Sequence, residues 1–114
     1  MDRKTILVVN DNEGIRDMLG ELLIMRGYDP IICEDGEHAI PYISEVDLLI
    51  TDFNMSGMDG IELTKMAKQQ KPGMPVIIIT GAPEDIPVGH LADQVIEKPF
   101  DIGHLKKVIA DLLQ

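Results

Sequence analysis

Residues 76–80 of the chain are Val-Ile-Ile-Ile-Thr, four β-branched apolar side chains followed by a threonine. A continuous apolar run of this kind is typical of a parallel strand that is covered on both faces of its sheet. Four more apolar runs predict further strands, at residues 6–9, 31–33, 46–50 and 95–96. The chain is therefore expected to contain five strands, with longer polar segments between them.

The segments between these runs have the spacing of helices. Residues 12–26 carry one apolar stripe and are followed by Gly27, which predicts a helix and its end. A second helix is expected between Gly60 and the sequence Lys71-Pro72-Gly73, and a third at residues 101–113 behind Asp101 as N-cap.

Two connections are less regular. Pro41 interrupts residues 37–44, so a short or bent helix is expected there. Residues 82–93 hold two prolines and a glycine without a clear apolar stripe, which predicts one turn or an irregular loop. Alternating strands and helices indicate an α/β fold, a single doubly wound parallel sheet with helices on both faces. The length of 114 residues fits one domain, residues 1–114.

Composition excludes several classes of function. The net charge of −10 and the pI near 4.5 disfavour direct binding of DNA or RNA, which depends on Lys and Arg neutralising phosphates. No apolar run approaches the length of a membrane span or forms a signal-peptide core. The single cysteine, Cys33, cannot form an internal disulfide and is expected to be buried. These features favour a cytoplasmic protein.

Polar residues follow four of the five apolar runs. Asn10 and Asp11 follow the first run and Asp52 the third, while Thr80 and Lys98 follow the fourth and fifth. Ligands of open parallel sheets bind outside the carboxyl ends of the strands, so these side chains are expected on one rim of the sheet. They are the candidate functional residues.

This set of side chains suits phosphoryl transfer. Asp11 and Asp52 held close together would repel each other, and Mg²⁺ relieves such repulsion while preferring oxygen ligands. An aspartate carboxylate can also act as a nucleophile toward phosphorus. Positive charge and hydrogen bonds then stabilise the oxygens of the transferring group, a role that suits Lys98 and the Thr80 hydroxyl.

Four pieces of the sequence resemble the receiver domains of two-component response regulators. They are Ile6-Leu7-Val8-Val9-Asn10-Asp11, residues 52–60 (Asp-Phe-Asn-Met-Ser-Gly-Met-Asp-Gly), residues 76–81 (Val-Ile-Ile-Ile-Thr-Gly) and Lys98-Pro99-Phe100. The resemblance covers essentially the whole chain, with the pieces in the family's order. Each piece alone is a weak pattern, and the four together are a strong one.

The resemblance implies a role for each residue. Asp52 would be the phosphoacceptor, Asp11 would help to hold Mg²⁺, and the backbone carbonyl of Asn54 would be another ligand. Thr80 and Lys98 would bind the phosphoryl group. The family also implies the strand order 2-1-3-4-5, which would explain why the second strand contributes nothing to the site, and a cis bond between Lys98 and Pro99. A histidine kinase or phosphotransfer protein is the implied partner, docking near the helix that starts around Asn12.

The chain departs from the family at two positions. Asn10 stands where a second acidic residue is usual, and its amide oxygen can orient a metal-bound water but brings no negative charge. Weaker Mg²⁺ binding is therefore expected. Val95 stands where an aromatic residue often changes rotamer on activation in the family, so an aromatic switch is absent. The surface made by the fourth helix, the fifth strand and the fifth helix, a common output face in the family, is therefore expected to be remodelled.

Two alternatives remain open from the sequence. A pseudo-receiver would keep the fold as a protein-interaction module without being phosphorylated, which Asn10 favours slightly. An enzyme on the same architecture lacks support, because no P-loop or G-x-G-x-x-G pattern is present. The chain is thus expected to catalyse only its own phosphorylation and dephosphorylation. The three scattered histidines do not suggest a zinc site by their spacing. The sequence names neither the kinase nor the output, which is a downstream protein or a missing effector domain.

Overall fold

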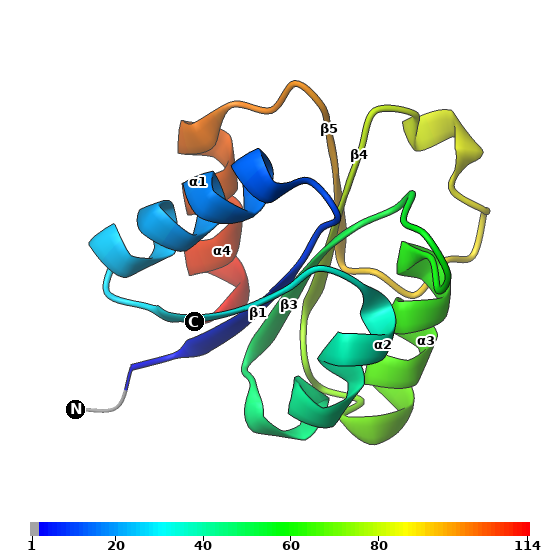
Figure 1. Ribbon diagram of the computed structural model, residues 1–114, viewed down its shortest axis with the longest axis horizontal. Helices are drawn as coiled ribbons and strands as arrows, with labels where there is room; N and C mark the ends of the chain where they lie inside the picture. The colour runs from blue at the N-terminus through cyan, green and yellow to red at the C-terminus, as the bar shows by residue number, and fades with distance from the viewer. Residues whose placement is uncertain (1–2) are drawn as a thin grey trace.

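The computed structural model describes residues 3–114 as one parallel sheet between two layers of helices (Figure 1). The strands are β1 (Thr5–Val9), β2 (Asp29–Cys33), β3 (Leu48–Asp52), β4 (Val76–Thr80) and β5 (Gln94–Glu97). Every neighbouring pair is parallel, and the order across the sheet is β2-β1-β3-β4-β5. Both the predicted α/β class and the strand order are confirmed.

Each face of the sheet carries its own set of helices. On one face lie α1 (Glu13–Met25) and α4 (Ile102–Leu112); on the other lie α2 (Gly36–Ala39), the 3₁₀ helix η1 (Ile40–Glu45) and α3 (Gly60–Gln70), as Figure 1 shows. Alternate residues of the strands point to opposite faces and so fill two separate cores. Ile6 and Ile50, for example, belong to the core under α1 and α4, whereas Leu7 and Leu49 belong to the core under α2 and α3.

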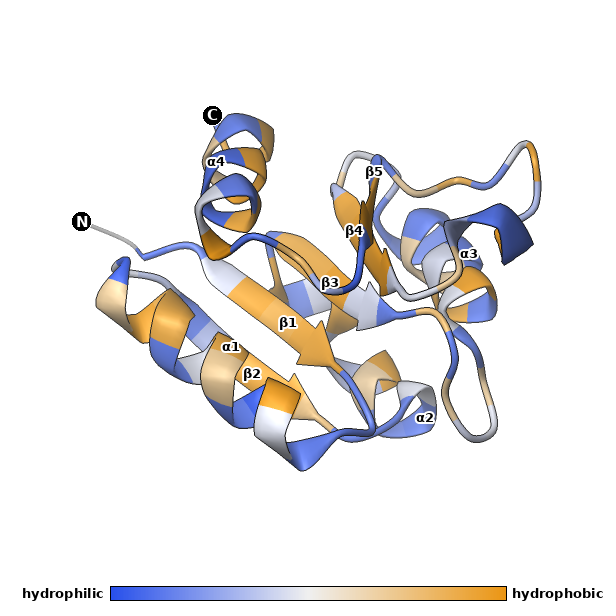
Figure 2. Ribbon diagram, turned by 90° about the horizontal axis from the view of Figure 1, so that it is seen from above, coloured by the Kyte–Doolittle hydropathy of each residue, from blue (hydrophilic) through white to orange (hydrophobic). Residues whose placement is uncertain are grey.

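The central strands are apolar because both of their faces are covered. All five residues of β3 and all five of β4 are buried, and Figure 2 shows the strands as the most hydrophobic part of the chain. The edge strand β2 is half-buried and contains Pro30, a residue that sheets accept only at an edge or a bulge. Burial of the strands therefore follows directly from the sheet order.

Side-chain caps fix where the long helices begin. The Asn12 side chain accepts a hydrogen bond from the Ile15 N–H at the start of α1. Asp101 accepts one from the Gly103 N–H in α4, which confirms the predicted N-cap. At α3, Asp59 and Glu62 form a reciprocal capping box. Caps of this kind each stabilise a helix by about 1 kcal/mol. At its other end α1 stops at Arg26, with Gly27 at a φ of +85°.

The two irregular connections are also as expected. The helix that contains Pro41 is short: α2 has four residues and continues as the 3₁₀ helix η1, with the proline at its start. Between β4 and β5 the only helical element among the described residues is η2 (Pro83–Asp85), one 3₁₀ turn. The loop after it exposes Val88 fully and Leu91 by half.

The predicted bounds of the third strand were wrong by two residues at each end. Val46 is buried, but it follows directly on η1. Asp47 bonds to Thr5 through its backbone N–H and its carboxylate, and the strand pairing with β1 begins at Leu48. At the other end Thr51 and Asp52 are polar, yet they pair with β4 opposite Ile78 and Ile79. A run of hydrophobic residues predicts which side chains are buried. The bounds of a strand depend instead on which backbone groups pair with a neighbouring strand.

Candidate functional site

Asp52 ends β3 at the carboxyl edge of the sheet, and its side chain is 7% exposed. The Lys98 ammonium lies 2.9 Å from Asp52 Oδ1, which also accepts a hydrogen bond of 3.1 Å from the Phe53 N–H. Lys98 itself is half-buried. A nearly buried carboxylate is thus held in place by one cation and one backbone donor.

Thr80 lies beside this pair at the end of β4. The Lys98 N–H donates to the Thr80 carbonyl at 2.8 Å, which ties the segment after β5 to the end of β4. The Thr80 side chain is buried, and its Oγ1 accepts a hydrogen bond of 3.0 Å from the Ala82 N–H. Its hydroxyl proton can still be donated to a ligand. The peptide bond between Lys98 and Pro99 is cis, in agreement with the expectation from the family.

The predicted metal ligands come from the neighbouring strand end and loop. The register pairs Val9 of β1 with Thr51 of β3, so Asn10 lies next to Asp52 across the rim. Asn10 is buried, and its amide oxygen accepts the Asn12 N–H at 2.9 Å. Asp11 follows on the exposed β1–α1 loop, and Asn54 on the exposed β3–α3 loop. Asn10 therefore shapes the β1–α1 loop in addition to any contact with a metal.

Arg16 is a cation that the sequence did not place at this rim. Its guanidinium, in the first turn of α1, donates to the Asn10 backbone carbonyl at 2.8 Å. An arginine on the surface of a helix gives no signal of this contact, because the direction of the side chain depends on how the loop folds back over the helix. The bond anchors the loop that carries Asp11.

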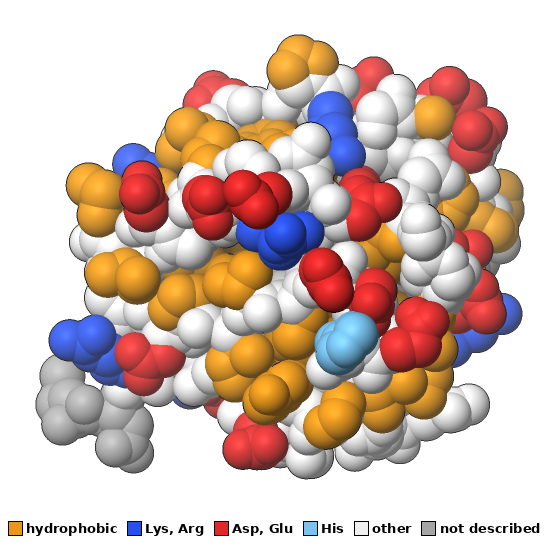
Figure 3. Space-filling view, in the orientation of Figure 1, with side chains coloured by type: hydrophobic (Ala, Val, Ile, Leu, Met, Phe, Trp, Pro, Cys, Tyr) orange, Lys and Arg blue, Asp and Glu red, His pale blue; other side chains and the backbone are white. Residues whose placement is uncertain are grey.

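The segment after β2 also reaches the rim, contrary to the expectation that the second strand contributes nothing. A cavity of about 340 Å³ lies beside Asp11. It is also lined by residues that follow β2 (Glu34, Asp35 and Glu37) and by residues that follow β3 (Ser56 and Gly57). Because β2 is the direct neighbour of β1, its carboxyl end opens onto the same edge. Figure 3 shows acidic side chains gathered in the middle of this face, with a histidine among them. The carboxylates beside Asp11 make the approach to the site strongly negative.

Asp35 and His38 form a tight pair at the edge of this cavity. The His38 backbone N–H and, next in importance, its ring donate to Asp35 and hold the pKa of that carboxyl below its ordinary value of 3.8. In return, the hydrogen bond to Asp35 and then its charge raise the pKa of His38 above 6.5. Each group is stabilised in its charged form by the other.

This pair predicts a pH dependence. The contribution of Asp35 to stability is present above its unfolded pKa and is lost as the pH falls through its lowered folded pKa. The contribution of His38 to stability is present below its unfolded pKa and is lost as the pH rises through its raised folded pKa. The pair is therefore expected to stabilise α2 most between about pH 4 and pH 6.5.

The substitution Asp35→Asn tests this pairing, since asparagine also caps helices. The pKa of His38, followed by NMR of its imidazole protons in the presence of a chelator, is expected to fall, because the largest cause of its rise is removed while Glu34 and Glu37 remain. The exposed His104 on α4 serves as an internal reference for the NMR signals of the two proteins. An unchanged His38 titration would show that Asp35 does not set it.

An apolar cavity lies on the other side of Lys98. Its volume is about 300 Å³, and its lining is almost wholly apolar apart from the lysine: Ile15, Met18, Lys98, Pro99, Phe100 and Ile102. The residues come from α1, from the segment after β5 and from the start of α4. The candidate site is thus bordered by an acidic cavity and an apolar one.

The donor set at the rim fits Mg²⁺. Asp11 and Asp52 offer carboxylates, Asn10 an amide oxygen and Asn54 a carbonyl, all hard oxygen donors of the kind that this ion prefers. Negative charge is gathered around them, and one ammonium group, that of Lys98, balances Asp52. This arrangement matches a site that binds a divalent cation and a phosphoryl group together.

Comparison with protein families decides the identity of the fold. The family model described as the response regulator receiver domain matches residues 6–110. The chain belongs to this family. Receiver domains are the phosphoacceptor switches of two-component response regulators, and the predicted resemblance is confirmed.

Individual relatives support the same assignment. The chain is 35% identical to the transcriptional regulatory protein GlrR of Escherichia coli, and the match covers 96% of this chain and 26% of GlrR. It is 33% identical to the phosphate regulon transcriptional regulatory protein PhoB of Pseudomonas aeruginosa, and that match covers 93% of this chain and 52% of PhoB. Among solved structures, the response regulator TrrA of Thermotoga maritima in complex with Mg²⁺-BeF has a TM-score of 0.86 at 33% identity, covering 96% of this chain and 99% of that one. A receiver domain from Pseudomonas fluorescens has a TM-score of 0.90 at 28% identity, with 98% and 95% covered.

The chain spans between about a quarter and a half of the curated relatives cited here. Among residues 3–114, no helix is both long enough and apolar enough to cross a membrane.

Proposed function

We propose that this receiver domain accepts a phosphoryl group on Asp52 from a histidine kinase or a phosphotransfer protein, in a reaction that depends on Mg²⁺. The observation that carries the proposal is the contact of 2.9 Å between the Lys98 ammonium and the Asp52 carboxylate, beside Thr80. A module that is never phosphorylated has no need for this combination of nucleophile, cation and hydroxyl.

The side chains support an in-line transfer. An Asp52 oxygen attacks phosphorus, a new O–P bond forms, and the P–N bond to the donor histidine breaks with its electron pair staying on the imidazole. The Lys98 ammonium, now against the carboxylate, can turn to a phosphoryl oxygen, and the Thr80 hydroxyl can donate to another. Asp11, Asp52 and the Asn54 carbonyl would hold Mg²⁺, with Asn10 as a further oxygen donor. When bound, the ion supplies positive charge against the phosphoryl oxygens.

The partners follow from the surroundings of the site. The apolar cavity between α1 and α4 adjoins Lys98 and offers a phosphorylated helical partner a docking surface within reach of Asp52. Output is by protein contact, to a downstream protein or to an effector domain in a longer chain. The net charge of −10 argues against direct contact of this domain with nucleic acid, and its location is proposed to be the cytoplasm.

Mass spectrometry of the intact protein tests the proposal. After incubation with acetyl phosphate and Mg²⁺, a mass increase of one phosphoryl group is expected, and a chelator should prevent it. A pseudo-receiver would gain no mass under either condition. Incubation with phosphorylated histidine kinases would then identify the partner that transfers its phosphoryl group fastest.

The substitution Asn10→Asp is expected to strengthen Mg²⁺ binding roughly tenfold, about 1.4 kcal/mol. The added carboxylate would lie next to Asp52 on the rim, where a divalent cation relieves the repulsion between the two. Isothermal titration calorimetry measures the dissociation constant directly. An unchanged constant would show that the amide of Asn10 serves only the loop, through its bond to the Asn12 N–H.

A further inference from the structure

Three metal-ligating side chains meet where β2 leads into α2. They are Glu34, Asp35 and His38, and one ligand atom from each lies within 4.8 Å of the others. None of the three belongs to the proposed phosphoacceptor site, although Glu34 and Asp35 also line the acidic cavity beside Asp11. All three are reachable from solvent, since Glu34 and His38 are exposed and Asp35 is half-buried.

The spacing of two of these groups already suits a shared ion. His38 Nδ1 lies 2.7 Å from one Asp35 carboxylate oxygen and 2.9 Å from the other. Adjacent ligands of an ion bound at about 2.1 Å are roughly 3 Å apart, which follows from tetrahedral or octahedral geometry. A cation could therefore replace the proton that the ring shares with Asp35, with only a small movement of either side chain.

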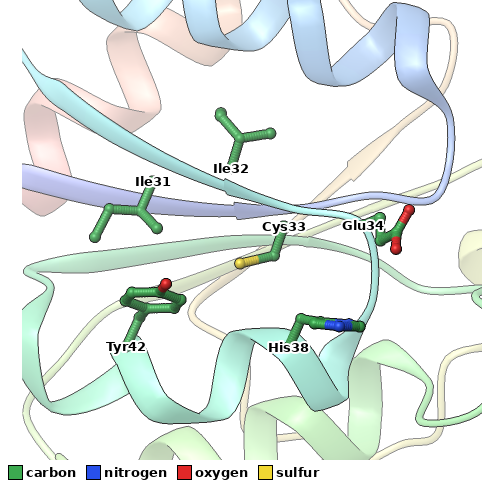
Figure 4. A pocket seen from close by; sticks show the side chains of 6 residues that line it. All are labelled: Ile31, Ile32, Cys33, Glu34, His38 and Tyr42. Carbon is green, nitrogen blue, oxygen red and sulfur yellow. The ribbon is translucent and has the colours of Figure 1, made fainter.

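A cavity next to the cluster gives an ion access to its ligand atoms. It has a volume of about 270 Å³, and Glu34, His38 and Cys33 are among the residues that line it (Figure 4). Cys33 is only 8% exposed, and Figure 4 shows its sulfur facing the space between β2 and the segment formed by α2, which bears His38, and η1, which bears Tyr42. The Cys33 sulfur is not among the ligand atoms that lie within 4.8 Å of one another, so the preference for a particular ion depends on the imidazole and the two carboxylates. The cavity also leaves room for water to complete the coordination of an ion.

We propose that Glu34, Asp35 and His38 form a second metal site, selective for Zn²⁺ over Mg²⁺, beside the cavity whose inner wall carries Cys33. An imidazole together with two carboxylates suits Zn²⁺, whereas Mg²⁺ prefers oxygen ligands alone. Binding at Nδ1 releases the proton now shared with Asp35, and the ring keeps its proton on Nε2. The site is separate from the phosphoacceptor site and does not depend on phosphorylation.

Calorimetric titration with Zn²⁺ in an excess of Mg²⁺ tests the proposal, because on the proposed function Mg²⁺ would occupy the oxygen ligands around Asp52. One Zn²⁺ per chain is expected. His38→Ala should weaken binding at least tenfold, since even the loss of an outer-shell partner of a metal ligand costs about 10–100-fold. Glu34→Gln, which keeps the shape of the side chain, should also weaken it. The control is His104→Ala, which removes an exposed histidine on α4 and should leave binding unchanged.

The side chain of His38 is 69% exposed, so its truncation leaves no cavity in the core. NMR gives a second measurement: Zn²⁺ should shift the imidazole signals of His38 and leave those of His104 in place. Absence of Zn²⁺ binding to the unmodified protein, or equal binding by His38→Ala, would overturn the proposal. So would a loss of binding in His104→Ala alone, because it would place the ion on α4.

Discussion

Lys98→Ala is expected to slow phosphorylation of the protein by acetyl phosphate about 100-fold. Lys98 is the cation in contact with Asp52, at 2.9 Å, and its ammonium is the group proposed to stabilise the oxygens of the transferring phosphoryl group. The loss of one well-placed donor of this kind typically costs a factor of about 10²–10³ in rate. The rate is measured by mass spectrometry of the intact protein over time, with Mg²⁺ at saturation.

Lys107→Ala is the matched control. It removes a lysine from the exposed surface of α4, where the ammonium lies 3.6 Å from an Asp111 oxygen, and it should leave the rate unchanged. Equal rates for Lys98→Ala and the unmodified protein would mean that Lys98 only balances the charge of Asp52 in the resting state.

Gly60→Ala is expected to lower the free energy of unfolding by about 1–3 kcal/mol, the usual cost of forcing extra atoms into a packed site. Alanine is the better helix former, so helix propensity alone would predict the opposite sign. The cause is the close approach of two backbones. A Cβ on Gly60 would lie 3.0 Å from the Phe53 Cα and would overlap the carbonyl oxygen of Asp52.

The same substitution should also slow phosphorylation, because the clash displaces the backbone that carries the nucleophile. Thermal unfolding followed by circular dichroism measures the first effect and the acetyl phosphate assay the second. Gly73→Ala is the control: no atom lies within 4 Å of the added methyl group, and a change below about 0.5 kcal/mol is expected. A Gly60→Ala protein as stable as the Gly73→Ala protein would contradict this account of α3 packing.

The sequence predicted the parts of the molecule that depend on local pattern. Continuous apolar runs located the strands, and Asn12 and Asp101 marked helix starts that the structure confirms. The placement of Pro41 and of the prolines in residues 82–93 correctly indicated the two weak helical connections. Asp52, Thr80 and Lys98 were selected as a group because strand ends in a parallel sheet share one edge, and the structure brings Lys98 into contact with Asp52.

What the sequence did not show depends on contacts between distant segments. Glu34 and Asp35 resemble ordinary exposed acidic residues after a strand, and only the position of β2 beside β1 brings them to the cavity of Asp11. The two-residue error in β3 has the same origin, because backbone pairing with β4 extends the strand through polar Thr51 and Asp52. The contact of Arg16 with the Asn10 carbonyl likewise depends on the path of a loop.

The central claim is that Asp52 is the residue that carries the phosphoryl group. The most direct measurement is to phosphorylate the protein in the presence of Mg²⁺, trap the acyl phosphate by borohydride reduction, and locate the modified residue by peptide mapping. Modification at residue 52, absent from an Asp52→Asn protein, is the predicted result. Modification at Asp11 or at another carboxylate, or none at all, would contradict the account.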